Sequence, residues 1–422
     1  MRFDFAHHHF NRRDAIRLGA AGAVAAAATG VAGVNPAGAR GRDDDDDDDD
    51  DDHNDHGHHE DCSRFNDDIF DYAAVIEGGY WVSPYGPGDG RGTFNEVTPE
   101  RTAKALKILK RGKPVHTYQM GEQMFNGFPA FPSEPPRLHD MSLYVFGYKA
   151  APEFVAGGGI QSGIVPFGPN GVIGHEERFA ENFTFQIASQ IDGLGHVGIA
   201  TGDSRGGWFY NDNYAADLIS PTGLTHLGNE TMGPLVTRGV ILDILGLKMA
   251  SDATDTYSFD DRGNAMLNGN YRITCADIQN AMRRQRIRKP IGAGDVPILR
   301  TGWTHLAHGD ADDQVAYLAE EPGIYLAEAR YFQDKKVAMV AGDTWGLEVL
   351  NEDVTGGYAF PCHQELFGKT GIRIGESFVC EAAVADHVYE GVLVVTPENV
   401  PGATCGSSAP AFLGQPGREP RD

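Results

Sequence analysis

The sequence predicts an α/β fold, and three observations support this class. From about Phe70 onward, strand-like runs alternate with helix-like stretches, instead of separating into all-α and all-β blocks. The hydrophobic content of 41% is enough for a sizeable core, and the chain shows no internal repeat. A length of 422 residues accommodates two or three average domains, but it also fits one large α/β domain.

The first clear helix of this alternation begins at Thr98 and is stopped by Gly112. Thr98 is a favourable cap, Pro99 suits the first helical turn, and an acidic residue follows directly. Apolar residues recur on one side of the stretch, which gives the helix a face to bury. Further along the chain, strands are predicted at 183–189, 239–245, 296–301, 337–342 and 391–396, and helices at 275–285, 323–333 and 363–369.

The first 39 residues have the pattern of an export signal. Two arginines, Arg12 and Arg13, precede a weakly apolar run of small residues, and an Ala-x-Ala cleavage pattern ends at Ala39. This arrangement looks like a twin-arginine signal peptide, so we expect residues 1–39 to engage the twin-arginine export machinery. A membrane anchor is the weaker alternative, because the run is short and built mainly of small residues. The mature protein is then expected to be periplasmic or secreted.

Residues 40–69 do not have the composition of a folded domain. Residues 43–52 are all aspartate, and histidines mixed with further acidic residues follow up to Asp61. Such a block repels itself and buries no apolar surface, so we expect a disordered linker. Its carboxylates and imidazoles also suit a metal-capturing tail, which is the alternative. The folded domain is predicted to cover residues 70–415, with a C-terminal tail at 416–422.

The net charge of −25 excludes two classes of partner. Nucleic-acid phosphates and anionic membrane surfaces both select clustered Lys and Arg, so we expect neither to bind the mature chain. A metal or another cationic ligand is compatible with this charge. The five cysteines contain no Cys-x-x-Cys pair; an oxidising compartment permits one or two bridges, but the spacing does not say which.

The segment from Gln186 to His196 concentrates ligand-capable side chains in a stretch that otherwise reads as a buried strand. If this segment is extended, the period of two places Gln186, Gln190 and Asp192 on one face. Two glycines then allow a tight bend that brings His196 toward the same place. Burying these groups without partners would cost a few kcal/mol each, so a metal or a hydrogen-bonded polar cluster must satisfy them. The residues alone leave both explanations open.

A second group of polar residues follows late in the chain. His363 begins a short predicted helix, and Glu376 lies in the next loop. A lone histidine near a helix start is more often an ordinary core or surface residue, so this pattern alone does not identify a site. Aromatic side chains that could line a substrate pocket are Tyr210, Trp208, Trp303 and Trp345, although core packing is the commoner role of such residues.

Several blocks of the sequence resemble the cyclase family, which includes bacterial kynurenine formamidase and isatin hydrolase. The family signature His-x-Gly-Thr-His-x-Asp-x-Pro-x-His aligns in register with residues 186–196. Further blocks follow in the family order, namely RGVILD at 238–243, GDVPILRTGW at 294–303, GDTWGLE at 342–348 and the segment 363–376. The resemblance covers about residues 70–415 and implies a single domain with a mixed central sheet or a barrel-like core flanked by helices.

The resemblance also implies a metal site. Asp192 would be the central ligand, and Gln190 and Gln186 occupy positions that the family usually fills with histidine. His363 and Glu376 would complete the ligand set, while His196, together with His363, would serve catalysis. The implied cofactor is a divalent ion, Mn²⁺ or Zn²⁺, with Mg²⁺ also compatible, since amide oxygens in place of two imidazoles favour harder ions.

The function implied by the resemblance is metal-dependent hydrolysis of a small molecule. The scissile bond would be the C–N bond of an amide, lactam or formamide, as in arylformamidases, or the ester bond of a lactone. A homodimer is implied as well. The alternative is a non-catalytic relative that binds a small molecule, with the two glutamines supplying hydrogen bonds where the metal used to be.

Overall fold

The computed structural model describes residues 62–69, 71–78, 81–146, 148–154, 160–164, 169–172 and 174–421. The predicted signal peptide and most of the predicted linker lie outside these residues, so both stay predictions. Within the described residues, no helix combines the length and the apolar character needed to cross a membrane.

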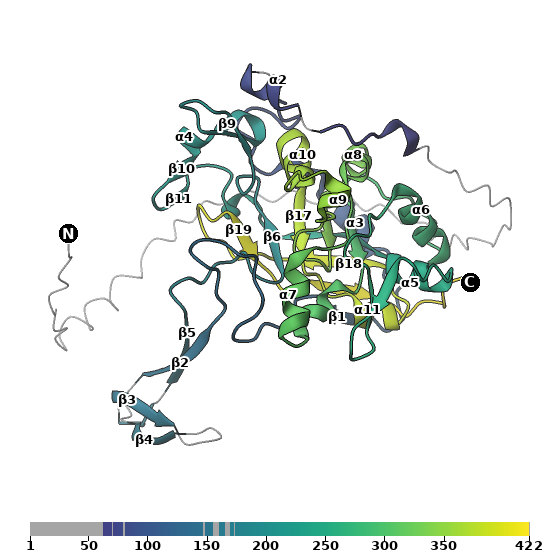
Figure 1. Ribbon diagram of the computed structural model, residues 1–422. Helices are drawn as coiled ribbons and strands as arrows, with labels where there is room; N and C mark the ends of the chain where they lie inside the picture. Colours follow the sequence, from purple (N-terminus) through teal and green to yellow (C-terminus); the bar gives the residue numbers. More distant parts are fainter. Residues whose placement is uncertain are drawn as a thin grey trace, which may run out of the picture. The chain divides into compact units, whose positions relative to one another are not determined.

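A mixed sheet of nine strands forms the centre of the domain (Figure 1). Across the sheet, the strands are β1 (His116–Gln119), β20 (Ala411–Gly414), β18 (Glu390–Val395), β12 (Leu235–Asp243), β15 (Val296–Arg300), β16 (Met339–Gly342), β17 (Arg373–Glu376), β6 (Gln190–Asp192) and β19 (Cys405–Ser407). The four strands from β12 to β17 run parallel, whereas the strands on either side of them pair antiparallel. The expected α/β fold with a mixed central sheet is confirmed.

Smaller sheets and helices surround this centre. The additional strands are β2 (Met141–Phe146) with β5 (Gly174–Phe179), β3 (Tyr148–Phe154) with β4 (Ile160–Ile164), β7 (Ile199–Ala200) with β8 (Gly207–Phe209) and β9 (Asn213–Tyr214), β10 (Ile219–Ser220) with β11 (Gly223–Leu224), and β13 (Tyr257–Phe259) with β14 (Ala265–Leu267). The α-helices are α2 (Tyr72–Ile76), α3 (Pro99–Leu106), α4 (Ala215–Leu218), α5 (Ile244–Ala250), α6 (Cys275–Arg284), α7 (Ala311–Ala319), α8 (Leu326–Lys335), α9 (Glu352–Thr355), α10 (Pro361–Glu365) and α11 (Glu381–Ala385). Short 3₁₀ turns occur at η1 (Cys62–Arg64), η2 (Gly92–Glu96), η3 (Tyr210–Asp212), η4 (Asn229–Thr231) and η5 (Trp303–His308), and a π-helical turn η6 (Leu366–Thr370) continues α10.

Local sequence signals explain where the main helices begin. At the start of α3, the hydroxyl of Thr98 accepts a hydrogen bond from the amide of Arg101, at 3.3 Å. At the start of α6, Thr274 and Asp277 form a reciprocal capping box. The α3 helix ends at Leu106, with Lys107 as its C-cap, so it is shorter than the predicted helix that extended to Gly112.

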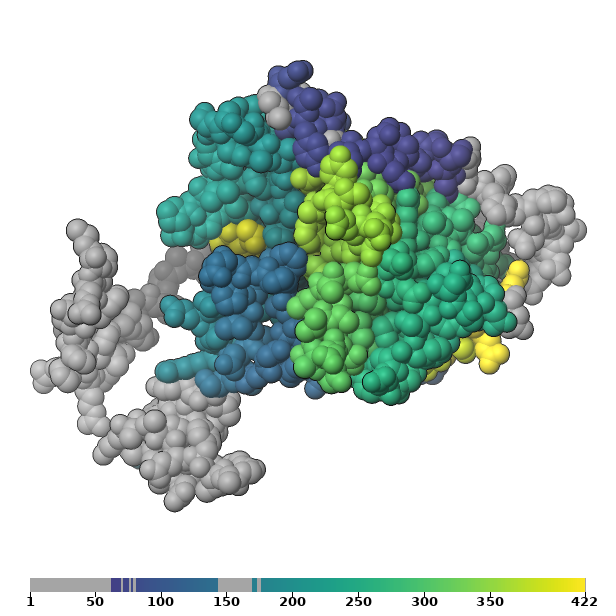
Figure 2. All heavy atoms as spheres, viewed as in Figure 1, coloured from purple at the N-terminus to yellow at the C-terminus, as the bar shows by residue number. Residues whose placement is uncertain are grey.

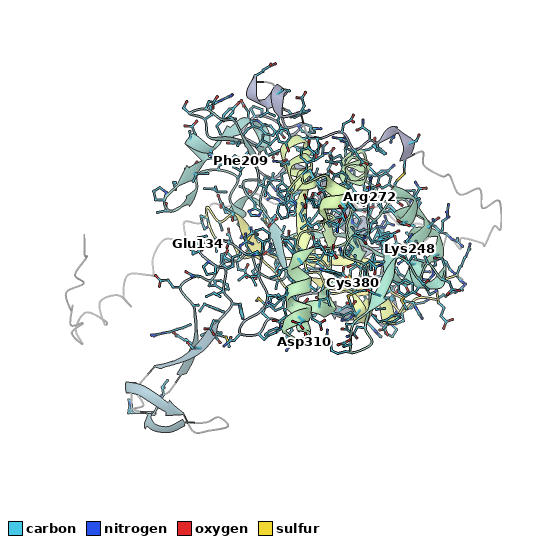
Figure 3. The ribbon with its side chains drawn as sticks, viewed as in Figure 1. Glu134, Phe209, Lys248, Arg272, Asp310 and Cys380 are labelled. Carbon is cyan, nitrogen blue, oxygen red and sulfur yellow. A yellow bond between two sulfur atoms is a disulfide. The ribbon has the colours of Figure 1, made fainter. Side chains whose placement is uncertain are left out.

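The apolar core lies between the central sheet and the helices that cover it. The strands β12, β15 and β16 are almost continuous apolar runs, because neighbours cover both faces of the parallel part of the sheet. Their side chains are buried with those of α6 and α8 in one large cluster. Figure 3 draws the described side chains on the ribbon. Each fully buried Val, Ile or Leu contributes about 1.5–3 kcal/mol, so this cluster is the main support of the sheet that carries the site.

The predicted strand at 183–189 is wrong. The chain from Phe183 to Ser189 consists of bends and irregular backbone, and only Gln190–Asp192 pairs as a strand. Ala188 has a φ of 59°, in the left-handed region that disrupts an extended run. The consequence is that Gln186 reaches its neighbours through a turn and not through a period-two face.

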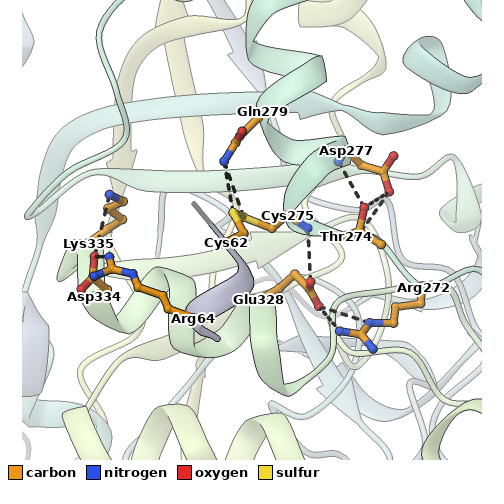
Figure 4. The surroundings of a disulfide bond; sticks show 10 residues. All are labelled: Cys62, Arg64, Arg272, Thr274, Cys275, Asp277, Gln279, Glu328, Asp334 and Lys335. Carbon is orange, nitrogen blue, oxygen red and sulfur yellow. Dashed lines mark hydrogen bonds and ion pairs between the residues drawn. A yellow bond between two sulfur atoms is a disulfide. The ribbon is translucent and has the colours of Figure 1, made fainter. Parts of the chain in front are cut away.

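The described N-terminal segment belongs to the domain, although it was predicted to be part of the linker. Cys62 forms a disulfide with Cys275 at the start of α6 (Figure 4). Nearby, Arg64 pairs with Asp334 of α8 at 2.6 Å, and Asp67 pairs with Arg272 at 2.6 Å. The domain therefore begins by Cys62, earlier than the predicted boundary at residue 70. At the other end, backbone hydrogen bonds attach the predicted tail to the domain through Gly417 and Arg421.

We expect loss of this disulfide to lower the free energy of unfolding by about 2–4 kcal/mol. The bond closes a loop with a sequence separation of 213 residues, so its removal restores much entropy to the unfolded chain. Denaturant unfolding of the double variant Cys62→Ala/Cys275→Ala checks this. Reductant should lower the stability of the unmodified protein to that of the variant, and should leave the variant unchanged. Equal stability of the oxidised and reduced unmodified protein would contradict the prediction.

Candidate metal centre

The short strand β6 carries the centre, because its two neighbours fix the position of each side chain. β6 pairs antiparallel with β17, and this register places Gln190 directly opposite Glu376. On its other side β6 pairs with β19, which places Asp192 opposite Cys405. Directly opposed side chains on one face lie close together, so the pairing brings residues 190 and 376 into contact. The side-chain Nε2 atom of Gln190 donates to Oε2 of Glu376 at 2.5 Å.

The turn before β6 brings Gln186 over the same strand. Nε2 of Gln190 donates to Oε1 of Gln186 at 2.9 Å, and Nε2 of Gln186 donates to Oδ1 of Asp192 at 3.3 Å. The three side chains therefore form a connected polar group, all of them buried. The predicted convergence of Gln186, Gln190 and Asp192 is present in the structure, but a bend at Ala188 produces it.

A tight turn after β6 returns His196 to the group. The amide of His196 donates to the carbonyl of Gly193 at 3.0 Å, and the amide of Gly193 donates to the carbonyl of Thr404. A Cβ atom at Gly193 would lie 2.6 Å from that Thr404 oxygen, so glycine is required for this close approach. The Nδ1 atom of His196 lies 3.3 Å from Nε2 of Gln186, and its Nε2 atom lies 3.8 Å from Oδ2 of Asp192.

His363 enters from α10, where Glu348 holds it. Nδ1 of His363 lies 2.6 Å from Oε1 of Glu348, and the backbone amides of Cys362 and His363 also donate to this carboxylate. Because Glu348 occupies Nδ1, the other ring nitrogen faces the centre. That Nε2 atom lies 3.6 Å from Oδ2 of Asp192 and 3.5 Å from Oε1 of Glu376.

Burial and mutual charge set the protonation of the group. Burial raises the pKa of Glu376 to about 7, and the charge of Asp192 adds to the effect. Burial opposes a charge on Asp192 as well, but the imidazoles of His196 and His363 outweigh it and lower the pKa of Asp192. Burial opposes a charge on His363, yet the nearby carboxylates of Asp192, Glu348 and Glu376 raise the pKa of the ring well above its ordinary value. A proton on His363 therefore balances the carboxylates in the absence of a metal.

The pKa of His196 is shifted in the opposite direction to that of His363. Burial lowers its pKa, and repulsion from His363 and Arg137 adds to that effect, against the attraction of Asp192. About a fifth of the His196 side chain is exposed, whereas Asp192 is fully enclosed. His196 is thus a neutral imidazole at neutral pH that solvent or a small molecule can reach.

The residues of this centre fit a divalent cation. One ligand atom each from Asp192, His363 and Glu376 can be chosen so that all three lie within 4.8 Å of one another. Two buried acceptor atoms of the described group, Oδ2 of Asp192 and Oε1 of Gln190, have no hydrogen-bond partner. A buried oxygen without a partner costs about 1–3 kcal/mol, which a bound cation would remove. The contact between His363 and Glu348 is also typical of a metal-binding histidine, whose second nitrogen is oriented by a carboxylate.

We expect metal affinity to rise with pH through about pH 7. Below that value Glu376 is protonated and His363 carries a proton, and the metal must displace both, because only the deprotonated groups are ligands. Each displaced proton gives about a tenfold gain in affinity per pH unit. Titration calorimetry with Mn²⁺ from pH 5.5 to 8, in buffers of different ionisation enthalpy, measures both the affinity and the released protons. An affinity that does not change over this range, without proton release, would contradict the assignment of these ligands.

A small cavity opens next to the centre. Its lining includes Gln186, Gln190 and Glu376 of the centre, and also Phe131, Arg137, Tyr317, Leu318 and Trp345. Tyr317 and Leu318 of this lining belong to α7. In Figure 2, the blue surface of the segment before residue 142 meets the green surface of α7. The cavity therefore lies where a small molecule could approach the candidate ligands.

The structure does not bring all predicted pocket residues to this cavity. Trp345 lines it, and its indole nitrogen donates to the carbonyl of Tyr317 at 2.7 Å. Trp303 is buried behind it and donates to the same carbonyl at 3.1 Å. Tyr210 is fully buried elsewhere, where its hydroxyl donates to Ser83 and to Asp89, so the expected substrate role of Tyr210 is wrong. Trp208 is likewise a core residue, packed with Val75 and Ile199.

Two residues of the site were missed by sequence reasoning. Glu348 belongs to the quoted block at 342–348, but nothing in its spacing indicates a contact with a histidine 15 residues later. Arg137 lies in a Pro-rich stretch without periodicity, and no motif marks it. Both are found only when the three-dimensional arrangement is known.

Comparisons with known proteins agree with this architecture. A model of the family described as "Putative cyclase" matches residues 117–349, more than half of the chain. A crystal structure described as a novel cyclase is 25% identical, with a TM-score of 0.59, and the match covers 78% of this chain and 97% of that one. Isatin hydrolase A from Ralstonia solanacearum is 15% identical, with a TM-score of 0.45 and coverage of 75% and 98%. A comparison with curated proteins gives no match.

The match to the family model includes Asp192, His196 and Glu348, whereas His363 and Glu376 lie beyond its end. The mixed sheet brings these later residues to the same place as the earlier ones. The extent of the match and the similarity of the fold lead to one conclusion: this chain is a member of the cyclase family.

Proposed function

We propose that the protein is a metal-dependent hydrolase that cleaves the C–N bond of an amide, lactam or formamide, or the ester bond of a lactone. One observation carries the proposal. The buried ligand residues Asp192, His363 and Glu376 lie close together, and two buried oxygens of the same group have no hydrogen-bond partner. A cavity opens beside this group, and the neutral His196 lies next to it. Mn²⁺ or Zn²⁺ is the proposed ion, with Mg²⁺ as the third choice, because the donors are mostly oxygens with one imidazole.

A divalent ion held by Asp192, His363 and Glu376 would polarise the scissile carbonyl and lower the pKa of a water molecule. Glu348 keeps Nε2 of His363 directed at the centre. His196, neutral because its pKa is lowered, accepts the proton of the attacking water and returns it to the leaving nitrogen or oxygen. The amide of Gln186 restrains the ring of His196 while this happens.

The test combines metal analysis with a small substrate panel. Protein reconstituted with Mn²⁺ or Zn²⁺ should contain about one ion per chain. It should hydrolyse at least one of an aryl formamide, a lactam and a lactone. EDTA should abolish this activity, and added metal should restore it. Full activity of the metal-free protein would overturn the proposal.

A second candidate function is binding without catalysis. The hydrogen-bonded series Gln186, Gln190 and Glu376 supports it, because the two amides already satisfy part of the polar group without an ion. In that case the protein would bind a small molecule, take up no metal after reconstitution, and hydrolyse no member of the panel.

We also propose export by the twin-arginine route. The segment that suggests it lies outside the described residues, so the support is the sequence pattern of residues 1–39 together with the disulfide between Cys62 and Cys275, which persists in oxidising compartments. Replacing Arg12 and Arg13 by lysine should prevent export of the chain, as measured by cell fractionation.

A further inference from the structure

Arg137 is the one positively charged side chain among the residues that line the cavity. Its Nη1 atom donates to the backbone carbonyl of Gln186 at 3.2 Å, and its guanidinium lies 5.4 Å from the centroid of the Phe131 ring. Both partners are uncharged, so they position Arg137 without neutralising it. The side chain is half-buried at the cavity wall.

The guanidinium of Arg137 has donors to spare. Of its five N–H groups, the contact with Gln186 uses one, and within the described ranges no carboxylate forms an ion pair with Arg137. The buried Arg238 behaves differently, because its guanidinium pairs with the carboxylates of both Asp295 and Glu390. A cation that is held in place but not neutralised, at the wall of a cavity, is suited to an anionic ligand.

The neighbouring wall is aromatic. The rings of Phe131 and Trp345 lie 5.3 Å apart and are tilted by 37°, and Phe360 packs edge-on against Phe131. Phe360, which is not among the lining residues, contacts the ring of His363 edge-on, so a series of aromatic contacts connects the cavity wall with the metal centre. Planar π-systems stack favourably on such surfaces. The cavity therefore combines an aromatic wall, a free guanidinium and the candidate ligands.

We infer that Arg137 selects substrates that carry a carboxylate on an aromatic ring, beside the amide or lactone group that is cleaved. This inference rests on the proposed hydrolase function and narrows its substrate class to aromatic amide or lactone acids. The planar fork of Arg137 matches a carboxylate in bidentate geometry, which lysine cannot reproduce. The carboxylate at Arg137 and the scissile carbonyl at the ligands would then fix the ring at two points.

The test uses two probes that differ only in the carboxylate, 2-formamidobenzoate and formanilide. For the metal-loaded protein we expect kcat/KM to be about 10- to 100-fold higher for the anionic probe, the range of a charge-assisted hydrogen bond pair. Arg137→Gln should reduce this preference to about one, chiefly by lowering kcat/KM for the anionic probe, and should leave the metal content unchanged. Arg137→Lys should keep only part of the preference. Arg111→Gln, which makes the same charge change outside the cavity, is the matched control.

Calorimetric binding of both probes separates this inference from the proposed function. If the protein hydrolyses both probes equally well and Arg137→Gln changes neither rate, the inference is overturned while the hydrolase function stands. If neither probe is hydrolysed, but 2-formamidobenzoate binds more tightly and Arg137→Gln removes the difference, the role of Arg137 stands and the hydrolase function fails for formamides. Equal binding of both probes without hydrolysis overturns the inference as well.

Discussion

Asp192→Asn is expected to lose both metal binding and hydrolysis. Oδ2 of Asp192 lies near Nε2 of both His363 and His196 and has no hydrogen-bond partner of its own, which makes it the central acceptor of the group. Asparagine keeps the size of the side chain but removes the charge and replaces one acceptor oxygen by a donor. We expect metal affinity to fall at least about 100-fold and kcat/KM about 1,000-fold or more. Elemental analysis after reconstitution and steady-state kinetics measure the two effects.

The control for this variant is Asp217→Asn, which makes the same charge change at an exposed position. It should retain full metal content and activity. Thermal unfolding of both variants shows whether the fold is intact. A folded Asp192→Asn protein that still binds one ion per chain with unchanged affinity would remove Asp192 from the ligand set.

The elements of the sheet were predictable because their signals are local. Thr98 and Thr274 are cap residues with partners a few positions later, and the buried parallel strands are runs of β-branched and aliphatic residues. The order of nine strands was not predictable in the same way. Pairing between β6 and β17 joins residues that are almost 190 positions apart, and only the family resemblance indicated that Asp192, His363 and Glu376 belong together.

The local path of the chain at the site was mispredicted because the backbone of one residue other than glycine has a positive φ. Ala188 adopts a φ of 59°, which is uncommon for a residue with a Cβ and costs roughly 1 kcal/mol. A glycine there would have indicated a turn, whereas alanine suggests a regular strand. Strain of this kind is found where surrounding contacts hold the backbone, and here the contacts of Gln186 and Gln190 do so.

Hydrogen bonding, and not residue type, distinguishes the predicted aromatic residue that lines the cavity from the one that is buried in the core. Tyr210 has its hydroxyl satisfied by Ser83 and Asp89, which allows complete burial, and it does not line the cavity. Trp345 directs its indole nitrogen at a backbone carbonyl and leaves a ring face at the cavity. Composition gives no hint of this difference, because each role depends on partners from distant parts of the chain.

His196→Gln is expected to separate catalysis from metal binding. His196 is not one of the three closely spaced ligand residues, its pKa is lowered so that it is neutral, and about a fifth of its side chain is exposed. Glutamine retains a polar side chain that can hydrogen-bond Gln186 but cannot accept a proton at neutral pH. We expect kcat to fall about 100- to 10,000-fold, the usual range for loss of a general base, with the metal content unchanged.

The pH profile identifies the role more sharply than the rate does. If His196 is the base, kcat/KM of the unmodified protein falls below the lowered pKa of this ring, and the residual activity of His196→Gln lacks that acidic limb. His226→Gln, at an exposed histidine, should preserve both the rate and the profile. Loss of the metal together with activity in His196→Gln would instead make His196 a ligand. In that case Gln186, which contacts both His196 and Asp192, would have to be reassigned to the positioning of that ligand.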